Sequence, residues 1–462
     1  MLYDELKKQA GDPDRLAIVT PKERVSWGEL QERVETARIQ VAELLPDREN
    51  RRLRVGFQVP ADIAGVAGLA ALDQLGCDAF LIDDMLDDAA AERLATDCRL
   101  SVLLSRREGS WTAKRITEDS EAGADTDTEN SVTILTSGTE GKPKAAAHTW
   151  TTLARPVRRL SPEKLASSPP QVWLASFRVQ LYAGLQVMLQ ALLNQGTLVM
   201  PEPGAAPNDV VGLMQSSGVT HASATPSYWR RLVLFADREA LVAVPLRQIT
   251  LGGEAADQQI LDALSEIFPA ARVAHIYATT ELGRCFSVTD GKAGFLKSWL
   301  DGVTDDSVEL RVEEDQLFVR SANAMTGYDT STEVGEKSHS ESDGWVATGD
   351  LVQVTDDRVL FAGRGGDMIN VGGNKVRPLA VEAVVRSVPY VADCRVFAKS
   401  SSIAGQLVAC EFVAADGADV DELKKAIAAA CREKLAGFEC PRFLAGVDQL
   451  ALSAAGKTRR QE

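Results

Sequence analysis

A loop rich in glycine, hydroxyl and lysine residues follows an apolar segment near residue 135. Residues 131–144 read SVTILTSGTEGKPK. Glycines let backbone N–H groups converge on an anion, hydroxyls donate further hydrogen bonds, and lysines supply positive charge. The loop is not a Walker phosphate loop, because the spacing from Gly138 to Lys142 is wrong and Pro143 follows the lysine. Its residues suit a polyphosphate better than the alternative, a solvated turn after an edge strand.

Three later segments combine glycines with aromatic, hydroxyl and carboxylate side chains: LGGE at 251–254, HIYATTE at 275–281 and DGWVATGDL at 343–351. A tyrosine can stack on a purine, a hydroxyl can reach a phosphate, and a carboxylate can hold Mg²⁺. A glycine-rich stretch, GRGGDMINVGGNKV at 363–376, and a basic one, LSAAGKTRR at 452–460, follow them.

These six segments, in this order, resemble those of the adenylate-forming superfamily, which comprises acyl- and aryl-CoA synthetases, peptide-synthetase adenylation domains and firefly luciferase. The resemblance runs from about residue 20 to Lys457. Four positions in these segments depart from the family pattern. Glu140 occupies a position that is usually Thr or Ser, Ala278 one that is usually glycine, and Leu452 one that is usually proline. Gly366 occupies the pivot position, where many relatives have Asp or Lys.

The resemblance implies a reaction in two halves: a carboxylate attacks the α-phosphate of ATP, giving acyl-AMP and pyrophosphate, and a thiol then displaces AMP. It makes Lys457 the catalytic residue, because its charge can bridge the carboxylate and the α-phosphate. Thr280 would contact the α-phosphate, and Glu281 would hold Mg²⁺. The other implied nucleotide-binding residues are Thr136, Ser137, Gly138, Thr139, Gly141 and Lys144 for the phosphates, Gly252, Gly253, Glu254 and Tyr277 for the adenine, and Asp350 and Arg364 for the ribose.

The predicted activity is therefore that of an AMP-forming acid–thiol ligase with ATP, Mg²⁺ and CoA as cofactors. Loading of the phosphopantetheine arm of a carrier protein is an alternative, as is a catalytically silent nucleotide-binding sensor. The sensor is disfavoured because Lys144, Glu281, Asp350, Arg364 and Lys457 are all present. Luciferase-type oxygenation uses the same adenylation and fold but is the rarer fate.

The segment before residue 184 bears on the identity of the acid. Gln180-Leu181 stand where many acyl and aryl ligases carry an aromatic–histidine pair, and Arg178 stands where amino-acid-activating relatives carry an aspartate. Ligases for o-succinylbenzoate carry an arginine where Gln190 falls, so that substrate is not favoured. We expect an apolar acyl or aryl acid, with the pocket walls formed by Phe177, Tyr182 and Tyr228.

The six motif segments must be positioned by the strands and helices around them. Apolar strands at 54–59, 79–82, 172–175 and 197–200 alternate with helices at 62–75, 184–193 and 210–216, which predicts parallel sheets with crossover helices. Helices are also expected at 3–9 and 26–45, the latter capped by Ser26 and Glu29. The acidic segment 119–129 is expected to be an exposed loop.

After residue 301 the sequence pattern changes from alternating strands and helices to short strands separated by turns. These strands are expected at 308–311, 316–320 and 345–348. We predict a large N-terminal AMP-binding domain, residues 1–364, of mixed and parallel sheets wrapped by helices. A small mobile α+β lid, residues 365–462, would follow, with strands at 395–398 and 408–413 and a helix at 420–435. The hinge is placed at Gly366, and the resemblance implies that Gly372 and Gly373 face the thiol tunnel after the lid rotates.

Composition limits the remaining possibilities. The 462 residues carry 50 Lys and Arg against 66 Asp and Glu, a formal charge of −16. This excess of negative charge argues against a nucleic-acid or anionic-membrane binder. The N-terminus lacks an apolar signal core, and no apolar run approaches the length of a membrane span. Seven scattered cysteines without a CxxC pair indicate free thiols in the cytoplasm, and the four histidines are too dispersed for a zinc site.

Overall fold

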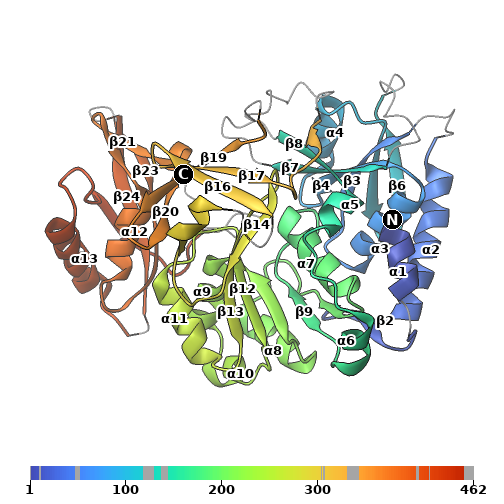
Figure 1. Ribbon diagram of the computed structural model, residues 1–462, viewed down its shortest axis with the longest axis horizontal. Coiled ribbons are helices and arrows are strands. Elements are labelled where there is room, and N and C mark those ends of the chain that lie inside the picture. Colours follow the sequence, from blue (N-terminus) through green and yellow to red (C-terminus); the bar gives the residue numbers. More distant parts are fainter. Residues whose placement is uncertain are drawn as a thin grey trace.

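The computed structural model describes residues 2–9, 12–46, 52–117, 129–136, 144–302, 304, 307–329, 343–401, 405–415 and 417–451. The described chain forms four β-sheets, three in a large N-terminal part and one in a smaller C-terminal part (Figure 1). This mixed α/β architecture confirms the predicted fold class. Most of the segment expected as an acidic loop, residues 119–128, lies outside the described residues.

One N-terminal sheet has seven strands, whose central members are parallel. Its strands in spatial order are β18 (Gly327–Tyr328), β8 (Lys144–Thr149), β7 (Ser131–Thr136), β4 (Asp78–Asp83), β3 (Arg54–Val59), β5 (Val102–Arg107) and β6 (Ser110–Arg115). The helices of this part of the sequence are α1 (Leu2–Gln9), α2 (Trp27–Leu44), α3 (Ile63–Gln74), α4 (Asp88–Asp97), α5 (Trp150–Ala154) and α6 (Pro162–Ser167).

A second sheet has eight strands, of which all but the two at its edges are parallel. Its spatial order is β14 (Gly283–Val288), β13 (Arg272–Thr279), β12 (Gln248–Gly252), β11 (His221–Ala224), β9 (Val172–Ala175), β10 (Thr197–Val199), β1 (Leu16–Val19) and β2 (Arg24–Ser26). Between these strands run α7 (Tyr182–Leu192), α8 (Pro207–Ser216), α9 (Pro226–Phe235), α10 (Arg238–Val242) and α11 (Gln258–Ile267).

Strand alternation divides the apolar interior around the eight-stranded sheet. Trp173 packs into a core shared with the seven-stranded sheet, where Phe57 is fully buried, whereas its neighbour Leu174 packs into a second core under α8, α9 and α11. Successive side chains of a strand point to opposite faces, so β9 contributes to both cores. Burial on both faces is what a parallel sheet covered by crossover helices requires.

A third, antiparallel sheet contains β15 (Phe295–Leu296), β20 (Arg358–Arg364), β19 (Val346–Val354), β17 (Gln316–Ser321) and β16 (Val308–Glu313), and the 3₁₀ helix η1 (Lys297–Asp301) lies beside it. The C-terminal sheet contains β22 (Asn374–Val376), β21 (Ile369–Val371), β24 (Gly405–Ala414), β23 (Val391–Ser401) and β25 (Phe443–Gly446), with α12 (Pro378–Arg386) and α13 (Val420–Lys434). The short 3₁₀ helix η2 (Gly365–Asp367) connects the two sheets.

The free cysteines agree with the sequence analysis. None of the seven forms a disulfide within the described part of the chain; six of them are buried and Cys440 is half-buried. No helix among the described residues is both long and apolar enough to cross a membrane.

Candidate active site

Several of the predicted site segments lie at one edge of the eight-stranded sheet. Strands β9, β11, β12 and β13 are parallel, so their carboxyl ends meet at the same edge. The segments that follow these strands begin at Ser176, Thr225, Gly253 and Thr280. Ligands of open α/β sheets bind outside the carboxyl ends of the strands. This edge is therefore the candidate active site.

The predicted adenine turn follows β12 directly. Gly253 has φ +83°, a left-handed conformation that favours glycine. Glu254 Oε2 accepts a hydrogen bond of 3.1 Å from the backbone N–H of Ser227, in the first turn of α9. The first turn of α9 is also capped by Thr225, whose hydroxyl accepts a hydrogen bond from the backbone N–H of Tyr228 at 3.0 Å. The hydrogen bond from Ser227 to Glu254 thus fixes the predicted adenine turn against the start of α9.

Thr280 and Glu281 follow β13. The imidazole of His148 donates from Nε2 to the Thr280 carbonyl at 2.7 Å, and its Nδ1 lies 3.2 Å from the Thr152 hydroxyl. Burial lowers the pKa of His148, so the ring is neutral, with its proton on Nε2. Sequence reasoning considered His148 only as a zinc ligand and missed this role in fixing the backbone of Thr280.

Glu281 is paired with a residue that sequence reasoning also missed. Tyr328, in β18, donates its hydroxyl to Glu281 Oε1 at 3.3 Å. The Lys144 ammonium lies 5.8 Å from the centre of the Tyr328 ring. Burial, and then the charge of Glu281, raise the pKa of Tyr328, so the phenol remains a donor. The pairing of β18 with β8 brings a cation, a phenol and a carboxylate together.

The predicted phosphate loop joins β7 to β8. Thr136 and Lys144 are directly opposite in this antiparallel pair, at the ends of the loop. Because Lys144 also lies beside Tyr328, this end of the seven-stranded sheet adjoins Glu281. The predicted phosphate-binding residues Ser137, Gly138, Thr139 and Gly141 lie outside the described residues, as does the predicted catalytic Lys457.

The predicted ribose-binding pair is formed in the structure. Asp350 is buried, with 8% of its surface exposed, and its Oδ1 accepts from Arg364 Nε at 2.9 Å. Its other oxygen accepts from the Tyr277 hydroxyl at 2.5 Å. The charge of Asp350 raises the pKa of Arg364. Burial, followed by the charge of Asp350, raises the pKa of Tyr277 well above its ordinary value, which keeps this phenol a donor.

The Tyr277 ring stacks on protein rings. Phe286 and Phe361 lie 5.2 Å and 5.1 Å from it, with interplanar angles of 23° and 25°. Tyr277 is thus part of an aromatic cluster and not an isolated tyrosine. Only the position of Tyr277 in the sequence was available for the prediction, because its two partners belong to other strands.

The predicted acid-pocket residues are buried. Phe177 and Tyr182 belong to the apolar core shared by the two large sheets, and Tyr228 packs against the second core. Burial raises the pKa of Tyr228 to about 12. Arg178 does not present a free charge, since it pairs with Asp83 at 2.8 Å and with Asp84.

Residues predicted to act in the second half-reaction are not brought to this edge. Gly372 and Gly373 form the exposed turn between β21 and β22 in the C-terminal domain, with φ +57° and +91°. The predicted hinge, Gly366, lies in η2 between the third sheet and the C-terminal sheet.

Comparisons with known proteins show the family of the chain. The family model for AMP-binding enzymes matches residues 6–328, and the model for the AMP-binding enzyme C-terminal domain matches residues 380–457. A 2-succinylbenzoate–CoA ligase of Bacillus cytotoxicus is 25% identical, over 97% of this chain and 95% of its own.

Two solved structures share the fold. An anthranilate CoA ligase in complex with anthranoyl-AMP has a TM-score of 0.77 at 19% identity, over 99% of this chain and 95% of its own. The o-succinylbenzoate CoA synthetase of Bacillus subtilis, in complex with its acyl-adenylate, has a TM-score of 0.72 at 22% identity, over 99% and 96%. These findings confirm the resemblance to adenylate-forming enzymes, and the chain belongs to the AMP-binding enzyme family.

Proposed function

We propose that this chain activates a carboxylic acid with ATP as an acyl-adenylate and then transfers the acyl group to the thiol of CoA. The observation that carries the proposal is the grouping of Lys144, Tyr328 and Glu281 beside Thr280 at the carboxyl edge of the eight-stranded sheet. A cation and a backbone-anchored hydroxyl residue next to a carboxylate suit a nucleotide phosphate with its metal ion.

In the first half-reaction, a substrate carboxylate oxygen bonds to the α-phosphorus while the bond from that phosphorus to the bridging oxygen breaks, and pyrophosphate leaves. Both reactants are anions, so positive charge must offset their repulsion. We assign this role to Lys144 and to Lys457, and α-phosphate contact to Thr280. In the second half-reaction, the CoA sulfur bonds to the acyl carbon and AMP leaves.

The nucleoside would be held by groups that are already ordered. We assign the ribose hydroxyls to Asp350, which Arg364 and Tyr277 fix from two sides. The adenine would lie along the turn of Gly252, Gly253 and Glu254. Groups fixed before the ligand arrives lose less entropy on binding.

Glu281 is the residue that we assign to Mg²⁺. Among the described residues, no cluster of three or more His, Cys, Asp or Glu side chains could hold a metal ion by itself. Mg²⁺ in nucleotide sites needs only one or two carboxylates, since phosphates and water complete its shell. A single carboxylate oriented by Tyr328 fits that donor set, and the metal would neutralise phosphate charge.

For the acid, we propose an apolar acyl or aryl substrate. The segment that follows β9 contains Gln180, which is 5% exposed and whose amide atoms have no hydrogen-bond partner among the described residues. Phe177, Tyr182 and Tyr228 supply apolar surface near this edge. An α-amino acid is disfavoured, because Arg178 offers no carboxylate for the ammonium group and its charge is already neutralised by Asp83 and Asp84.

The substrate named for the Bacillus cytotoxicus relative is the main competitor. Gln190, which stands where an arginine was expected for that substrate, uses its amide to bind the backbone of Arg158 at both the N–H, 3.1 Å, and the carbonyl, 3.2 Å. It therefore offers no charge for a second carboxylate. Phosphopantetheine on a carrier protein is the alternative acceptor of the acyl group. A cytoplasmic location fits the absence of disulfides among the described cysteines.

The proposal is tested with a panel of acids. Purified chain, ATP and Mg²⁺ are incubated with aliphatic acids, benzoates, anthranilate, 2-succinylbenzoate or amino acids, and pyrophosphate release is measured. CoA or a phosphopantetheinylated carrier is then added and thioester is quantified. We expect pyrophosphate with apolar acyl or aryl acids and thioester with CoA. ATP binding without pyrophosphate release from any acid would instead support the nucleotide sensor.

A further inference from the structure

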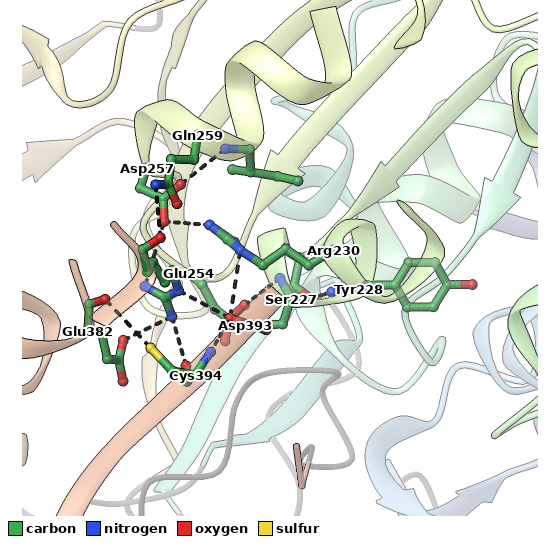
Figure 2. A network of polar contacts seen from close by, with 12 residues as sticks. Ser227, Tyr228, Arg230, Glu254, Asp257, Gln259, Glu382, Asp393 and Cys394 are labelled. Atoms are coloured by element: carbon green, nitrogen blue, oxygen red, sulfur yellow. Dashed lines mark hydrogen bonds and ion pairs between the residues drawn. The ribbon is translucent and has the colours of Figure 1, made fainter. Parts of the chain in front are cut away.

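Five charged side chains meet between the N-terminal and C-terminal parts of the molecule (Figure 2). Arg230 in α9 and Asp257 at the start of α11 come from the N-terminal part. Glu382 and Arg386 in α12 and Asp393 in β23 come from the C-terminal part. We call this set the interdomain charge cluster. None of these residues belongs to the nucleotide site described above.

Opposite charges alternate across the boundary. Arg230 pairs with Asp257 in its own part and lies 3.8 Å from Asp393 of the other, measured from Nε to Oδ1. Arg386 pairs with Asp393 at 3.1 Å and reaches back to Asp257 at 3.6 Å. Each arginine therefore contacts an aspartate on both sides, and Figure 2 shows Arg230 between Asp257 and Asp393. Rotation of one part against the other would separate both cross-boundary pairs.

Most of the cluster is shielded from solvent, and Asp257, at 37% exposed, is its most accessible member. The side chains of Arg230, Asp393 and Arg386 are only 10%, 11% and 13% exposed. Asp393 also accepts from the N–H of Cys394 at 2.8 Å, and Arg386 donates to the Cys394 carbonyl at 3.0 Å. Partly buried ion pairs are screened much less by salt than exposed ones, and their geometry is more restrictive.

A backbone contact supports the same arrangement. The amide of Gln259, in α11, donates to the carbonyl of Arg386 at the end of α12, at 3.3 Å. Glu382 is fully buried, and it holds α12 to β23 by accepting from the N–H of Val396 at 3.0 Å. The charges on the C-terminal side are thus presented by an element that is itself fixed to its sheet.

In this orientation, the last described residues of the C-terminal part lie against α9 of the N-terminal part. Gln449 and Leu450 line a cavity of about 210 Å³ together with Ser227 and Arg231 of α9. Ser227 is the residue bonded to Glu254 of the predicted adenine turn. Leu450 precedes Lys457 by seven residues, a length of chain that spans at most about 25 Å.

The glycine turn of the C-terminal domain, Gly372 and Gly373, follows β21, which lies apart from β12 and β13 in Figure 1. We propose that the interdomain charge cluster positions the C-terminal domain for acyl-adenylate formation, and that loosening it favours the other orientation. The proposal rests on the function proposed above. It assigns Arg230, Asp257, Arg386 and Asp393 as positioning residues, which act through the placement of Lys457 and touch no substrate.

The sharpest variant is Asp257→Asn. Asp257 caps α11 by accepting from the N–H of Ile260 at 3.1 Å, and asparagine caps helices equally well. The substitution therefore removes the charge that joins Arg230 to Arg386 while it keeps the helix. Asp87→Asn is the matched control, because Asp87 caps the N–H of Ala90 at 2.7 Å and α4 lies far from the C-terminal domain (Figure 1).

Two half-reactions are measured for each variant. We expect Asp257→Asn to lower kcat for acyl-adenylate formation about tenfold, with the KM for ATP unchanged, and to leave thioester formation from supplied acyl-adenylate and CoA at or above the wild-type rate. Arg230→Gln should act alike, and the double variant should be less than additive. Equal loss of both half-reactions, or no loss of either, would overturn the proposal.

A distance measurement tests the orientation without activity. Spin labels are attached to Val242→Cys in α10 and Lys425→Cys in α13, positions 49% and 74% exposed, with Cys440 replaced by serine. We expect one distance in the wild type and a second or broader population in Asp257→Asn. An unchanged distribution would refute the positioning role, whereas a wild type that releases no pyrophosphate with any acid would refute the proposed function instead.

Discussion

The guanidinium of Arg364 donates to Asp350 across two directly paired strands, at 2.9 Å from Nε to Oδ1. Arg364 is the last residue of β20, immediately before η2. The buried carboxylate that we assign to the ribose is therefore linked to the point where the chain leaves for the C-terminal domain. Tyr277 donates to the other oxygen of the Asp350 carboxylate. We therefore expect a substitution at the Asp350–Arg364 pair to weaken nucleotide binding more than it alters the C-terminal domain.

Asp350→Asn tests the ribose assignment. The amide keeps the shape but loses the charge that receives hydrogen bonds from both ribose hydroxyls. We expect ATP affinity, measured by calorimetry, to fall about tenfold to a hundredfold. Folding should persist, because the Arg364 side chain is 55% exposed and can be hydrated.

The control for this variant is Glu309→Gln in the same sheet. Glu309 pairs with Arg320 across β16 and β17, where both side chains are accessible to solvent. An exposed pair contributes little stability and is remote from the predicted ribose site. ATP affinity that is unchanged in Asp350→Asn, or equally reduced in Glu309→Gln, would remove Asp350 from the site.

Glu281→Gln tests the metal site. A neutral amide cannot balance the charge of a hard divalent cation. We expect the Mg²⁺ concentration for half-maximal acyl-adenylate formation to rise about tenfold or more. Tyr328→Phe keeps the ring beside Lys144 and removes only the hydrogen bond, so its effect should be about threefold. The assignment is wrong if Mg²⁺ dependence is the same in wild type and Glu281→Gln.

Elements with complete local signals were predicted well from the sequence. The strand expected at 54–59 is β3, residue for residue, and that expected at 172–175 is β9. The helix expected at 26–45 is α2, with both hydrogen bonds of the Ser26–Glu29 capping box present. Alternation and caps are encoded within a few residues, so they do not depend on the rest of the fold.

Contacts between distant residues could not be predicted in this way. Tyr328 reaches Glu281 across 47 residues of sequence, and only the pairing of β18 with β8 brings it there. Arg178 stands where amino-acid-activating relatives carry an aspartate, but its pairing with Asp83 and Asp84 has no signal in the sequence. The motifs led to a predicted nucleotide site only because the family resemblance supplied information that no local pattern contains.

Lys457→Ala tests the residue to which we assign catalysis. Its charge would be needed only while negative charge develops between the carboxylate and the α-phosphate. We expect acyl-adenylate formation to fall by a factor of about 10² or more, while thioester formation from supplied acyl-adenylate remains near the wild-type rate. A variant that still adenylates at more than about a tenth of the wild-type rate would refute the role.

His221 predicts a pH dependence of folding. Burial, and secondarily the charge of Arg247, lower its pKa from 6.5 to about 4. The unfolded chain therefore binds a proton at this histidine before the folded chain does, and stability falls as the pH drops from about 6.5 toward about 4. Once the pH is below 4, the loss from this group amounts to about 3 kcal/mol.

His221→Phe isolates that contribution, because it keeps a ring beside Trp173, whose centre lies 4.8 Å away. Urea unfolding of wild type and variant is compared at several pH values. We expect the unfolding free energy of the wild type to fall relative to that of the variant as the pH decreases from about 7 to about 4.5. A difference that is constant with pH would show that His221 does not titrate in this window.

Gly366 is the position that we predict to be the hinge. It does not have a left-handed φ, and a methyl group built on it would meet no atom within 4 Å. Gly366→Ala should therefore fold normally and retain both half-reactions. Gly366→Pro fixes φ near −65° and restricts Gly365, which limits the rotation between the two domains.

Acyl-adenylate formation and thioester formation need different orientations of the C-terminal domain in the proposed mechanism. We therefore expect Gly366→Pro to reduce one half-reaction far more than the other, measured separately with ATP and acid, and with supplied acyl-adenylate and CoA. The Gly366→Ala variant controls for loss of glycine as such. If the folded proline variant loses both half-reactions equally, or neither, the pivot lies elsewhere, and Asp367, the last residue of η2, is the next position to substitute.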